Sequence, residues 1–573
     1  MRKSRGANVA AVSAGAVLLA STAVAMAAPA GAAAAAGCSV DYSVSSQWQG
    51  GFGANVTITN LGDPVSGWAL TWSYSAGQTV QQAWNTSLSQ SGAAVTARNV
   101  DYNGAIATNG TASFGFNGSW AGSNPAPTSF ALNGVACTGG TGPTTPPPTT
   151  PPPTTPPPTT PPPNGPADIT VNSATRYQTV DGFGAATPIW GGTWSTAETQ
   201  TLVGMGANQL GLSIVRTGLS PVSSEWSTQV NALKTAKTSG SGVKILASPW
   251  TAPAAWKTNN SRVNGGKLKT DYYDDYANHL NSYVQYMRNQ GVAIDVTSVQ
   301  NEPDWHPDYD SMDWSGTEFR NFVRDQGARV QNTRLMVAEA VNMNYTFTDP
   351  TLNDTTARNN IGYIGGHLYG TEDSGRLRPY SLAEQYNKPV WMTEWNYHEA
   401  DGSGSNIWGN PSNLAVWNET LDDIMRTVHK SMESNWSAYI WWYGKRYYSF
   451  IGDGEAAYGT TAGAPLKRGY AFSQYAKFVR PGYQRVALTK SSKASPLEVT
   501  AYQGDGKITL VILNRSNSPV TNAVIRAPQN VTRAEHYLTS QNANVASQPT
   551  SVNGGQATIN VGARSISTVV FTL

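Results

Sequence analysis

The sequence predicts a multidomain protein: a β-sandwich, a Pro/Thr-rich linker, and a (β/α)8 TIM barrel with an appended side β-sandwich. Three observations lead to this prediction. Short strand patterns fill the region before the linker, eight apolar runs alternate with helical stretches after it, and strand patterns return towards the C-terminus. The 573 residues are enough for all of these parts together.

Residues 1–36 are predicted to be a signal peptide. A basic start, MRKSRG, precedes an Ala-rich apolar segment with small-residue cleavage sites. No later segment has about 18 continuous apolar residues, so we expect a secreted protein without a membrane-spanning segment. The net charge of +2, from 38 Lys and Arg against 36 Asp and Glu, argues against a nucleic-acid partner or an anionic membrane.

Residues 37–138 have the pattern of a small β-sandwich. Short alternating segments such as ANVTITN and GWALTWSY are separated by Gly and Asn turns, and no helical period is present. The side chains that share one face of GWALTWSY are predicted to lie in the core: Trp68, Leu70, Trp72 and Tyr74. Cys38 and Cys137 are the only cysteines of the chain and bracket this segment, so a disulfide is predicted between them.

Three aromatic residues of this segment stand apart from the core pattern. Trp48, Trp84 and Tyr102 each lie near a turn among amides and glycines, where an exposed ring can stack on the flat C–H face of a pyranose. The segment resembles a family 2 carbohydrate-binding module over its full length, including the terminal cysteines. The resemblance implies that these three rings bind cellulose or xylan; the third is Tyr where Trp is commoner, which can weaken binding.

Residues 139–166 contain TTPPPTTPPPTTPPPTTPPP, a repeat that cannot form a core. Proline favours extended polyproline II with a rise of ~3.1 Å per residue, so the linker is predicted to be a stiff spacer. A spacer of this kind indicates two modules that act at different places on one large target.

Residues 167–475 are predicted to form the (β/α)8 barrel. The region contains eight short apolar runs, most of them separated by helical stretches such as YANHLNSYVQYMRNQG. The runs are DGFGAA, SIVRTG, VKILASPW, DVTSVQNEP, LMVAEA, YIGGHLYG, PVWMTEW and AYIWWYG. Strand patterns over residues 476–573 predict the side β-sandwich, interpreted as a rigid buttress. Residues 167–180 are strand-like and either begin the barrel or join this side domain.

Two glutamates lie where a barrel of this kind carries its active site, at the C-terminal ends of the strands. Glu302 ends the fourth run and Glu394 ends the seventh. A pair of carboxylates about 5 Å apart is what retaining glycoside hydrolysis requires. Asn301 can hold the sugar 2-hydroxyl beside Glu302, which favours Glu302 as the acid/base. Glu394 is then the nucleophile, with the lower pKa of the two.

The region from about residue 167 to the C-terminus resembles glycoside hydrolase family 30, in which a (β/α)8 barrel is joined to a side β-sandwich. The motifs that carry the resemblance are DGFGAA, SPWTAPAAWKTNN, SVQNEPDWHPD, WMTEW, AYIWWYGKRYYS and LKRGYAFSQYAKFVRPGY. The resemblance implies the same roles for Glu302 and Glu394. Within the family, the segment NGGKLKTDYYDDYANHL is most similar to the bacterial glucuronoxylan-cleaving xylanases. The β-1,6-glucanase, β-1,6-galactanase and glucosylceramidase branches match less well.

These xylanases hold the carboxylate of a (4-O-methyl)glucuronate branch with an arginine in the loop after the eighth strand. They usually have Trp-Trp-Tyr-Ile-Arg-Arg there, whereas this chain has WWYGKRYYS. The resemblance therefore implies that Arg446 or Lys445 holds the branch, although Lys does not match the bidentate grip of Arg. The alternative is that both residues are charges at the rim of the site.

Further substrate contacts are predicted in the loops at the strand ends. The aromatic residues that can stack on xylose rings there, or pack structurally, are Trp250, Trp256, Trp305, Trp395, Tyr443 and Tyr447. His367 is expected to bond the substrate or to orient Glu394. Glu339 is expected to support the catalytic pair, whereas Asp304 and Asp181 are further candidates or simple loop acids. With six histidines, no HExxH motif and no dinucleotide fingerprint, neither a metal nor a cofactor is predicted.

From these residues and the resemblance we expect a secreted, monomeric, retaining endo-β-1,4-xylanase. It cleaves plant xylan at glucuronate-substituted sites and is tethered to the cell wall by its N-terminal module. One alternative is a family 30 enzyme of another specificity: an endo-β-1,6-glucanase, a galactanase or an exo-acting xylosidase. The other is a non-catalytic polysaccharide-binding protein, which has no need of the Glu302 and Glu394 pair. The sequence leaves open whether glucuronate is required and whether the module prefers cellulose or xylan.

Overall fold

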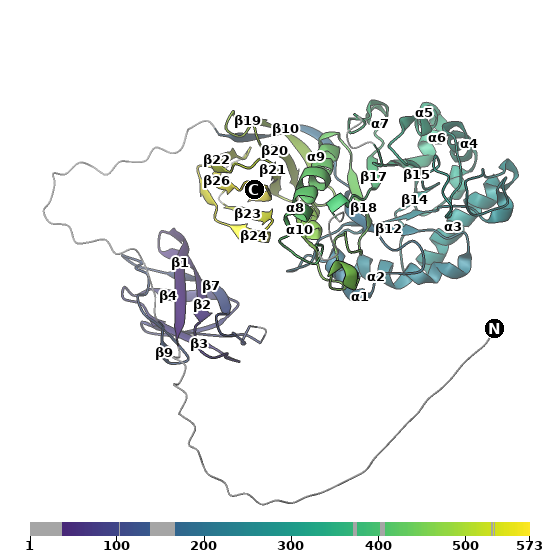
Figure 1. Ribbon diagram of the computed structural model, residues 1–573. Coiled ribbons are helices and arrows are strands. Elements are labelled where there is room, and N and C mark those ends of the chain that lie inside the picture. Colours follow the sequence, from purple (N-terminus) through teal and green to yellow (C-terminus); the bar gives the residue numbers. More distant parts are fainter. Residues whose placement is uncertain are drawn as a thin grey trace, which may run out of the picture. The chain divides into compact units, whose positions relative to one another are not determined.

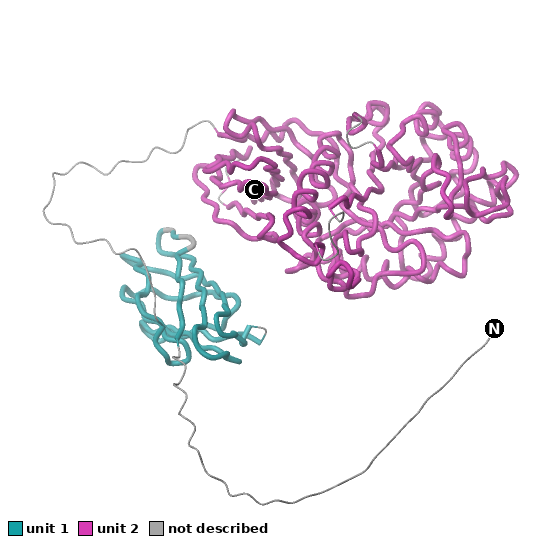
Figure 2. The backbone as a smooth tube through the Cα atoms, viewed as in Figure 1, with its two compact units in different colours: residues 1–157 teal, residues 158–573 magenta. Residues whose placement is uncertain are grey.

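The computed structural model describes residues 37–101, 103–137, 167–370, 375–400, 407–528, 531 and 533–573. The predicted signal peptide and linker therefore lie outside the described residues. The chain divides into two compact units, residues 1–157 and residues 158–573, which Figure 2 colours separately. Within the described ranges, no helix is both long enough and apolar enough to cross a membrane.

The first unit is a β-sandwich of two antiparallel sheets. One sheet has the order β1-β2-β7-β4 and the other the order β5-β6-β3-β8-β9. The strands are β1 (Cys38–Trp48), β2 (Gly51–Asn60), β3 (Ala69–Ser73), β4 (Thr79–Trp84), β5 (Ser87–Ser91), β6 (Ala94–Arg98), β7 (Thr111–Ser119), β8 (Phe130–Leu132) and β9 (Val135–Ala136). Trp68 and Trp72 are buried and stack on Phe114, which confirms the predicted core face. The predicted disulfide joins Cys38 to Cys137.

The three aromatics predicted to bind sugar differ in what the structure describes. Trp84 ends β4 and is 42% exposed, so its ring is available to a ligand. The ring lies over Gly115, its partner on β7, where a Cβ atom would come within 2.5 Å of it. Glycine is therefore needed there to hold the ring on the sheet. Trp48 ends β1, a strand of the same sheet, and Tyr102 lies outside the described residues.

The second unit contains the predicted barrel of eight parallel strands, which the pairing of β11 with β18 closes. Figure 1 labels β12, β14, β15, β17 and β18 of this barrel. The strands are β11 (Gly182–Ala186), β12 (Ile214–Gly218), β13 (Lys244–Ser248), β14 (Val296–Ser298), β15 (Arg334–Ala340), β16 (Ile361–His367), β17 (Val390–Glu394) and β18 (Ala438–Tyr443). Each overlaps one of the eight predicted runs. Side chains from six of the strands form one interior cluster, in which Trp391 of β17 is the largest.

Helices surround the barrel, and their buried residues pack against it or, for α10, on nearly all sides. They are α1 (Thr196–Val203), α2 (Val230–Ser239), α3 (Tyr273–Asn289), α4 (Gly316–Gln326), α5 (Asp349–Asn353), α6 (Thr355–Asn360), α7 (Ser381–Gln385), α8 (Leu414–Glu419), α9 (Arg426–Glu433) and α10 (Lys467–Ala476). On α3 the residues spaced for one face, Leu280, Val284 and Met287, are buried as the period predicts. Capping boxes at Ser195 and Ser315 fix the starts of α1 and α4.

The side domain is one ten-stranded sheet with the order β24-β23-β27-β21-β20-β19-β10-β22-β26-β25. Its strands are β10 (Ile169–Thr179), β19 (Gln484–Lys490), β20 (Glu498–Gly504), β21 (Lys507–Asn514), β22 (Val520–Arg526), β23 (Arg533–Ser540), β24 (Ala543–Gln548), β25 (Ser551–Asn553), β26 (Gln556–Val561) and β27 (Ser565–Thr572). Leu510 of β21 and Ile525 of β22 share one core cluster although their strands are not neighbours, so the sheet folds over on itself as a sandwich does. β10 pairs with β19, which places the segment before the barrel in the side domain.

The side sheet packs on the barrel through the helices α8, α9 and α10, which lie between them in Figure 1. Leu513 of β21 belongs to the same core cluster as Phe472 of α10. The buried guanidinium of Arg468 in α10 pairs with Glu419 of α8 and donates to the carbonyl of Tyr448. These bonds connect the helix beneath the side sheet to the loop after β18, at the C-terminal end of the barrel.

Candidate active site

The two predicted catalytic glutamates lie together at the C-terminal end of the barrel. Glu302 follows β14 and Glu394 is the last residue of β17. Both are buried, with 7% and 5% of their surface exposed. One carboxylate oxygen of each, together with a ring nitrogen of His367 at the end of β16, lie within 4.8 Å of one another. This spacing fits the retaining glycosidases, whose two carboxyl groups are about 5 Å apart.

The backbone at Glu302 has an unusual conformation that fixes its side chain. Its φ is +44°, in the left-handed region that a residue with a side chain rarely adopts. Its N–H donates to the carbonyl of Glu339 (3.0 Å), and its own carbonyl accepts from the N–H of Trp305 (3.2 Å). Glu339, in β15, has a φ of +48°. Such strained backbone persists where surrounding bonds maintain it, and it is concentrated at functional sites.

Arg216, in β12, connects the residues of the site. It is fully buried, and its Nη1 donates to Oε2 of Glu394 (2.6 Å) while its Nε donates to Oε1 of Glu339 (3.1 Å). Its Nη2 donates to the amide oxygen of Asn301 (2.5 Å). With that oxygen bonded to Arg216, the NH2 group is the part of the Asn301 amide that can donate to a ligand. The rigid guanidinium thus sets the positions of Glu394 and Asn301.

Glu339 is an anion beside the catalytic pair. Burial disfavours its charge, but Arg216 and then His367 outweigh burial and lower the pKa of Glu339 to about 2. Its carboxyl therefore stays ionised and balances the charge of Arg216. This arrangement fits a supporting position rather than proton transfer.

Burial raises the pKa of the Glu394 carboxyl above its ordinary value. The expectation that Glu394 has the lower pKa of the catalytic pair stays a prediction. His367 and Arg216 act against the rise, whereas the charge of Glu302 adds to it. Burial at the barrel mouth follows from the packing of the loops, which the sequence pattern does not show.

His367 contacts Glu302 rather than Glu394. Its Nδ1 is 3.1 Å from Oε1 of Glu302, and its Nε2 is 3.9 Å from Oε1 of Glu339 and from Oε2 of Glu394. Burial disfavours a charged imidazole, but Glu394, Glu302 and Glu339 raise the pKa of His367 to about 9. Three ligand atoms in the site are close enough to hold a metal ion. A protonated imidazole has no lone pair to offer, so His367 is a poor metal ligand at neutral pH.

We expect His367 to make the stability of the protein depend on pH. The pKa of this imidazole is about 9 in the folded protein, whereas its ordinary value, which applies to the unfolded chain, is 6.5. Its charge therefore stabilises the fold fully below pH 6.5, and the contribution is lost as the pH rises towards 9. His367→Gln should remove this part of the pH dependence. Thermal unfolding across this range measures it, and a parallel fall in both proteins would contradict the assignment.

Tyr369 and Asn396 complete the contacts of Glu394. The Tyr369 hydroxyl donates to Oε1 of Glu394 (3.0 Å) and accepts from Nδ2 of Asn396 (2.8 Å). Burial, and then the charge of Glu394, raise the pKa of Tyr369 well above its ordinary value, so its hydroxyl keeps the proton. Arg216 and Tyr369 thus hold one oxygen of Glu394 each, which fixes the plane of the carboxylate.

Aromatic rings line the mouth of the site. Trp250, after β13, is 4% exposed and its ring lies 4.8 Å from the guanidinium of Arg216. Trp190 and Tyr309 are 44% and 38% exposed and contact each other edge-to-face at 5.4 Å. Trp305, beyond Glu302, is 52% exposed. Exposed rings are therefore available for sugar stacking, as predicted for Trp305, whereas Trp250 contacts the buried arginine.

The structure does not support a stacking role for two of the predicted rings. Trp395 is 1% exposed in the barrel core, and Tyr447 is 8% exposed with its ring stacked on Tyr458 at 3.5 Å. Both rings take the packing alternative, because the position of a residue at a strand end does not fix the direction of its side chain. Tyr443 is half-buried, and its hydroxyl accepts from the N–H of Ile189 (3.4 Å).

The loop after β18 contains both cations that were predicted to hold the glucuronate branch, and their ion-pair partners differ. Lys445 forms an ion pair with Glu198 at 2.7 Å, and Glu198 also belongs to the capping box of α1. Arg446 is exposed, with its guanidinium 5.9 Å from the ring of Tyr447. Among the residues that the structure describes, no carboxylate forms an ion pair with Arg446. Arg446 therefore has a charge available to an anionic ligand, whereas the charge of Lys445 is already paired.

The remaining predicted residues have structural contacts. Asp304 accepts from the N–H of Val341 through Oδ1 (3.0 Å), which joins the loops after β14 and β15. Asp181 precedes β11, at the N-terminal end of the barrel, and pairs with Lys244. Trp256 is half-buried and stacks on a neighbouring tyrosine. These contacts are those of loop acids and of a packing aromatic.

Sequence reasoning missed Arg216, Tyr369, Trp190 and Tyr309. Arg216 carried a usable signal, since a charged residue inside the apolar run SIVRTG needs a partner once its strand is buried. Tyr369 follows His367 closely in YIGGHLYG and so lies at the same strand end. Trp190 and Tyr309 lie in loops, where no periodic pattern marks a residue.

Comparison with known proteins matches two segments of the chain to family models. Residues 38–137 match the model of the cellulose binding domain, and residues 219–435 match that of the glycosyl hydrolase family 30 TIM-barrel domain. The N-terminal part is 56% identical over 115 residues to endoglucanase CelA of Streptomyces lividans, covering 20% of this chain and 25% of that protein.

A larger part of the chain is similar in sequence to a protein named glucuronoxylanase, and in sequence and structure to one named xylanase. Glucuronoxylanase XynC of Bacillus subtilis (strain 168) is 33% identical over 414 residues, covering 70% of this chain and 92% of that protein. The family 30 subfamily 8 xylanase Xyn30A from Clostridium acetobutylicum is 30% identical with a TM-score of 0.61, covering 71% of this chain and 100% of that chain. The protein therefore belongs to glycoside hydrolase family 30 and carries a family 2 carbohydrate-binding module at its N-terminal side.

Proposed function

We propose that the protein is a secreted, retaining endo-β-1,4-xylanase that cleaves xylan at glucuronate-substituted sites and is held on the plant cell wall by its N-terminal module. The observation that carries the proposal is the spacing of Glu302 and Glu394, which have carboxylate oxygens within 4.8 Å of each other. The similarity to proteins named glucuronoxylanase and xylanase supports xylan as the substrate.

In the first step Glu394 attacks the anomeric carbon while Glu302 gives its proton to the glycosidic oxygen. The bond from that carbon to the leaving oxygen breaks, and an ester forms between the sugar and Glu394. Arg216 and Tyr369 fix the plane of the attacking carboxylate, so little reorganisation is needed. The NH2 group of Asn301 is free to donate to the sugar 2-hydroxyl, a bond that strengthens in the transition state.

In the second step Glu302 takes a proton from water, and the oxygen of that water attacks the anomeric carbon. The ester breaks, Glu394 leaves as a carboxylate, and the product keeps its anomeric configuration. His367 is the hydrogen-bond partner that keeps the Glu302 carboxyl oriented through both steps.

Arg446 is the proposed contact of the glucuronate branch, because it lies exposed at the C-terminal end of β18 without a paired carboxylate among the described residues. Arg446→Ala should lower kcat/KM on glucuronoxylan by roughly 10- to 100-fold, since a charge-assisted hydrogen bond is lost. Lys445→Ala is the matched control, because Lys445 is already paired with Glu198. An equal loss on glucuronoxylan and on unbranched xylan in Arg446→Ala would contradict the assignment.

Digestion of glucuronoxylan, arabinoxylan and β-1,6-glucan side by side, followed by mass spectrometry, tests the proposed function. We expect every glucuronoxylan product to carry one glucuronate at a fixed distance from its reducing end. Release of single xylose units would favour the exo-acting alternative, and cleavage of β-1,6-glucan would favour the other linkage. Absence of any product would favour the binding protein without catalysis.

The N-terminal module is proposed to bind cellulose or xylan through Trp84, together with Trp48 and Tyr102. The exposed ring of Trp84 supports this role. The similarity to the corresponding part of an endoglucanase supports it as well. The disulfide between Cys38 and Cys137 fits an oxidising, extracellular compartment, where such a wall-bound enzyme acts.

A further inference from the structure

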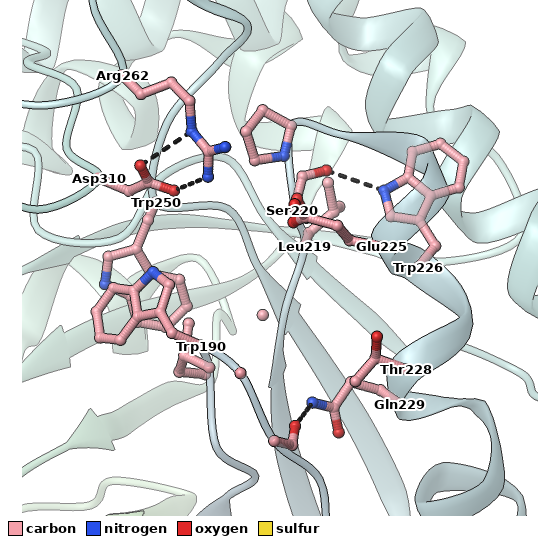
Figure 3. A pocket seen from close by; sticks show the side chains of 15 residues that line it. Trp190, Leu219, Ser220, Glu225, Trp226, Thr228, Gln229, Trp250, Arg262 and Asp310 are labelled. Atoms are coloured by element: carbon pink, nitrogen blue, oxygen red, sulfur yellow. Dashed lines mark hydrogen bonds and ion pairs between the residues drawn. The ribbon is translucent and has the colours of Figure 1, made fainter.

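Two pairs of loops at the C-terminal end of the barrel are joined by an arginine. Between the loops after β13 and β14, Nε of Arg262 donates to Oδ1 of Asp310 (3.0 Å) in the wall of the cavity that Figure 3 shows. The side chain of Arg262 is 36% exposed, so water weakens this ion pair. The loops after β17 and β18 are joined by Arg468, which is buried.

Arg468 is the second residue of α10, the helix that lies between the barrel and the side sheet in Figure 1. A cation in the first turn of a helix is disfavoured by the positive end of the helix dipole. The side chain is also only 1% exposed, and a buried charge is costly unless its partners bond it. The contacts of this arginine, and not the formation of the helix, therefore explain its presence.

Arg468 bonds the backbone of both loops. Its Nη1 donates to the carbonyl oxygens of Tyr397 (2.7 Å) and Tyr448 (2.8 Å). Its Nη2 donates to Glu419 of α8, whose other carboxylate oxygen accepts from the N–H of Ala400. The ion pair thus holds the loop after β17 at two places and the loop after β18 at one. The planar fork of a guanidinium provides these directed bonds, which an ammonium does not.

The two loops contact each other where Arg468 bonds them. The ring of His398, next to Tyr397, stacks on the ring of Tyr448 with 4.4 Å between their centroids. Burial raises the pKa of Tyr448 to about 12, and the charge of Arg446 acts against this rise. Arg446 therefore lies close to the tyrosine whose carbonyl Arg468 holds.

A second set of contacts connects the same two arginines. The guanidinium of Arg468 lies 4.3 Å from the ring centroid of Trp408, which is buried. Trp408 contacts the ring of Tyr447 edge-to-face at 6.0 Å, and the guanidinium of Arg446 lies 5.9 Å from that ring. Backbone bonds and packed rings both lead from Arg468 to Arg446.

We propose that Arg468 is a positioning residue that sets the place of Arg446, so that α10 takes part in the selection of glucuronate-branched xylan. This inference rests on the proposed function. A guanidinium holds a carboxylate through two parallel hydrogen bonds, so a small shift of the loop weakens the grip. Glu394 is held by Arg216 and Tyr369 instead, so the two catalytic steps do not depend on Arg468.

Arg468→Lys tests the proposal, because it keeps a charge opposite Glu419 but not the fork that bonds two loops. The substrates are two xylo-oligosaccharides of equal length, one with a single glucuronate and one with none. We expect the ratio of kcat/KM between the branched and the unbranched substrate to fall about tenfold, mainly through KM on the branched one. The kcat on the branched substrate should stay close to that of the wild type.

Lys467→Met is the matched control. Lys467 is the neighbour of Arg468 on α10 and is also buried, but its ammonium donates to the carbonyls of Ser540 (2.9 Å) and Ala543 (3.2 Å) in β23 and β24. Its loss should lower the midpoint of thermal unfolding and leave the substrate ratio unchanged. An equal fall of the ratio in both variants would assign Arg468 a merely structural role and overturn the proposal.

A double variant shows whether Arg468 acts through Arg446. Adding Arg468→Lys to Arg446→Ala should not lower the ratio further, because the group that Arg468 positions is already absent. A further tenfold fall would overturn the proposal. A wild-type ratio in Arg446→Ala alone would instead overturn the proposed glucuronate contact, so the two failures are distinct.

Glu419→Gln keeps the proposal testable if Arg468→Lys does not fold, which thermal unfolding shows. The substitution retains Arg468 but removes the charge that fixes its guanidinium and that accepts from Ala400. We expect the ratio to fall in the same direction, though by less. A folded Glu419→Gln protein with the wild-type ratio would contradict the positioning role.

Discussion

Glu394→Ala is expected to lower kcat for xylan hydrolysis by at least about 10⁴-fold, the scale on which loss of a nucleophile affects other enzymes. Without this carboxylate no glycosyl ester forms, and Arg216 and Tyr369 lose the group that they orient. Sodium azide should restore part of the turnover on an aryl xyloside, because a small anion can occupy the vacated space. The sugar azide formed by direct attack should have the inverted configuration, which NMR determines.

Glu302→Ala distinguishes the two roles. We expect a loss of about 10²- to 10⁴-fold on xylan, where the leaving oxygen needs a proton. Much less loss is expected for the first step on an aryl xyloside with an acidic phenol, which leaves without one. Azide should then give a product of retained configuration. The same anomer from both variants would show that the assignment of acid/base and nucleophile is wrong.

Binding to cellulose provides the control for both variants. The module with Trp84 belongs to a separate compact unit, so retention on cellulose should equal that of the unaltered protein. Loss of retention together with loss of catalysis would show that the two units do not act independently.

Arg216→Met is expected to reduce both stability and activity. The substitution leaves Glu339 and Glu394 buried without the cation that pairs with both, and breaking a buried ion pair from one side costs about 3–5 kcal/mol. Removing Arg216 also raises the pKa of Glu394 further, so the acid limb of the kcat/KM profile should move to higher pH. Chemical denaturation and a pH–rate profile measure the two effects.

The loss of stability should itself depend on pH. Glu339 has a pKa of about 2 in the folded protein against an ordinary 4.5, so its pairing stabilises the fold above pH 4.5 and is lost as the pH falls towards 2. The difference between Arg216→Met and the unaltered protein should shrink over that range. Arg324→Met, which removes an exposed pair with Asp325, is the control and should change little. A difference that stayed constant with pH would contradict the role of Glu339.

The barrel could be predicted because its strands are buried on both faces and therefore appear as apolar runs. The same rule placed Glu302 and Glu394 at one end of the barrel, since parallel strands all point the same way. The single sheet of the side domain could not be predicted, because strand patterns do not reveal which strands pair. Only the fold shows that β10 lies beside β19.

The contacts inside the site were harder to predict than its position. A residue at a strand end points into the mouth or into the core, and the sequence does not distinguish Trp305, which is exposed, from Trp395, which is buried. The choice between Lys445 and Arg446 depended on Glu198, which comes from a helix that starts more than 200 residues earlier in the chain. Raised or lowered pKa values depend on such contacts and on burial.

The pairing of β10 with β19 has a consequence for the synthesis of the chain. Arg176 and Gln484, which bond across these strands, are 308 residues apart. The first strand after the linker therefore leaves the ribosome long before its neighbour exists, and it stays unpaired until the whole barrel has been made. Closure over so long a loop is slow, so the sheet of the side domain is completed only after the intervening barrel segment has been made.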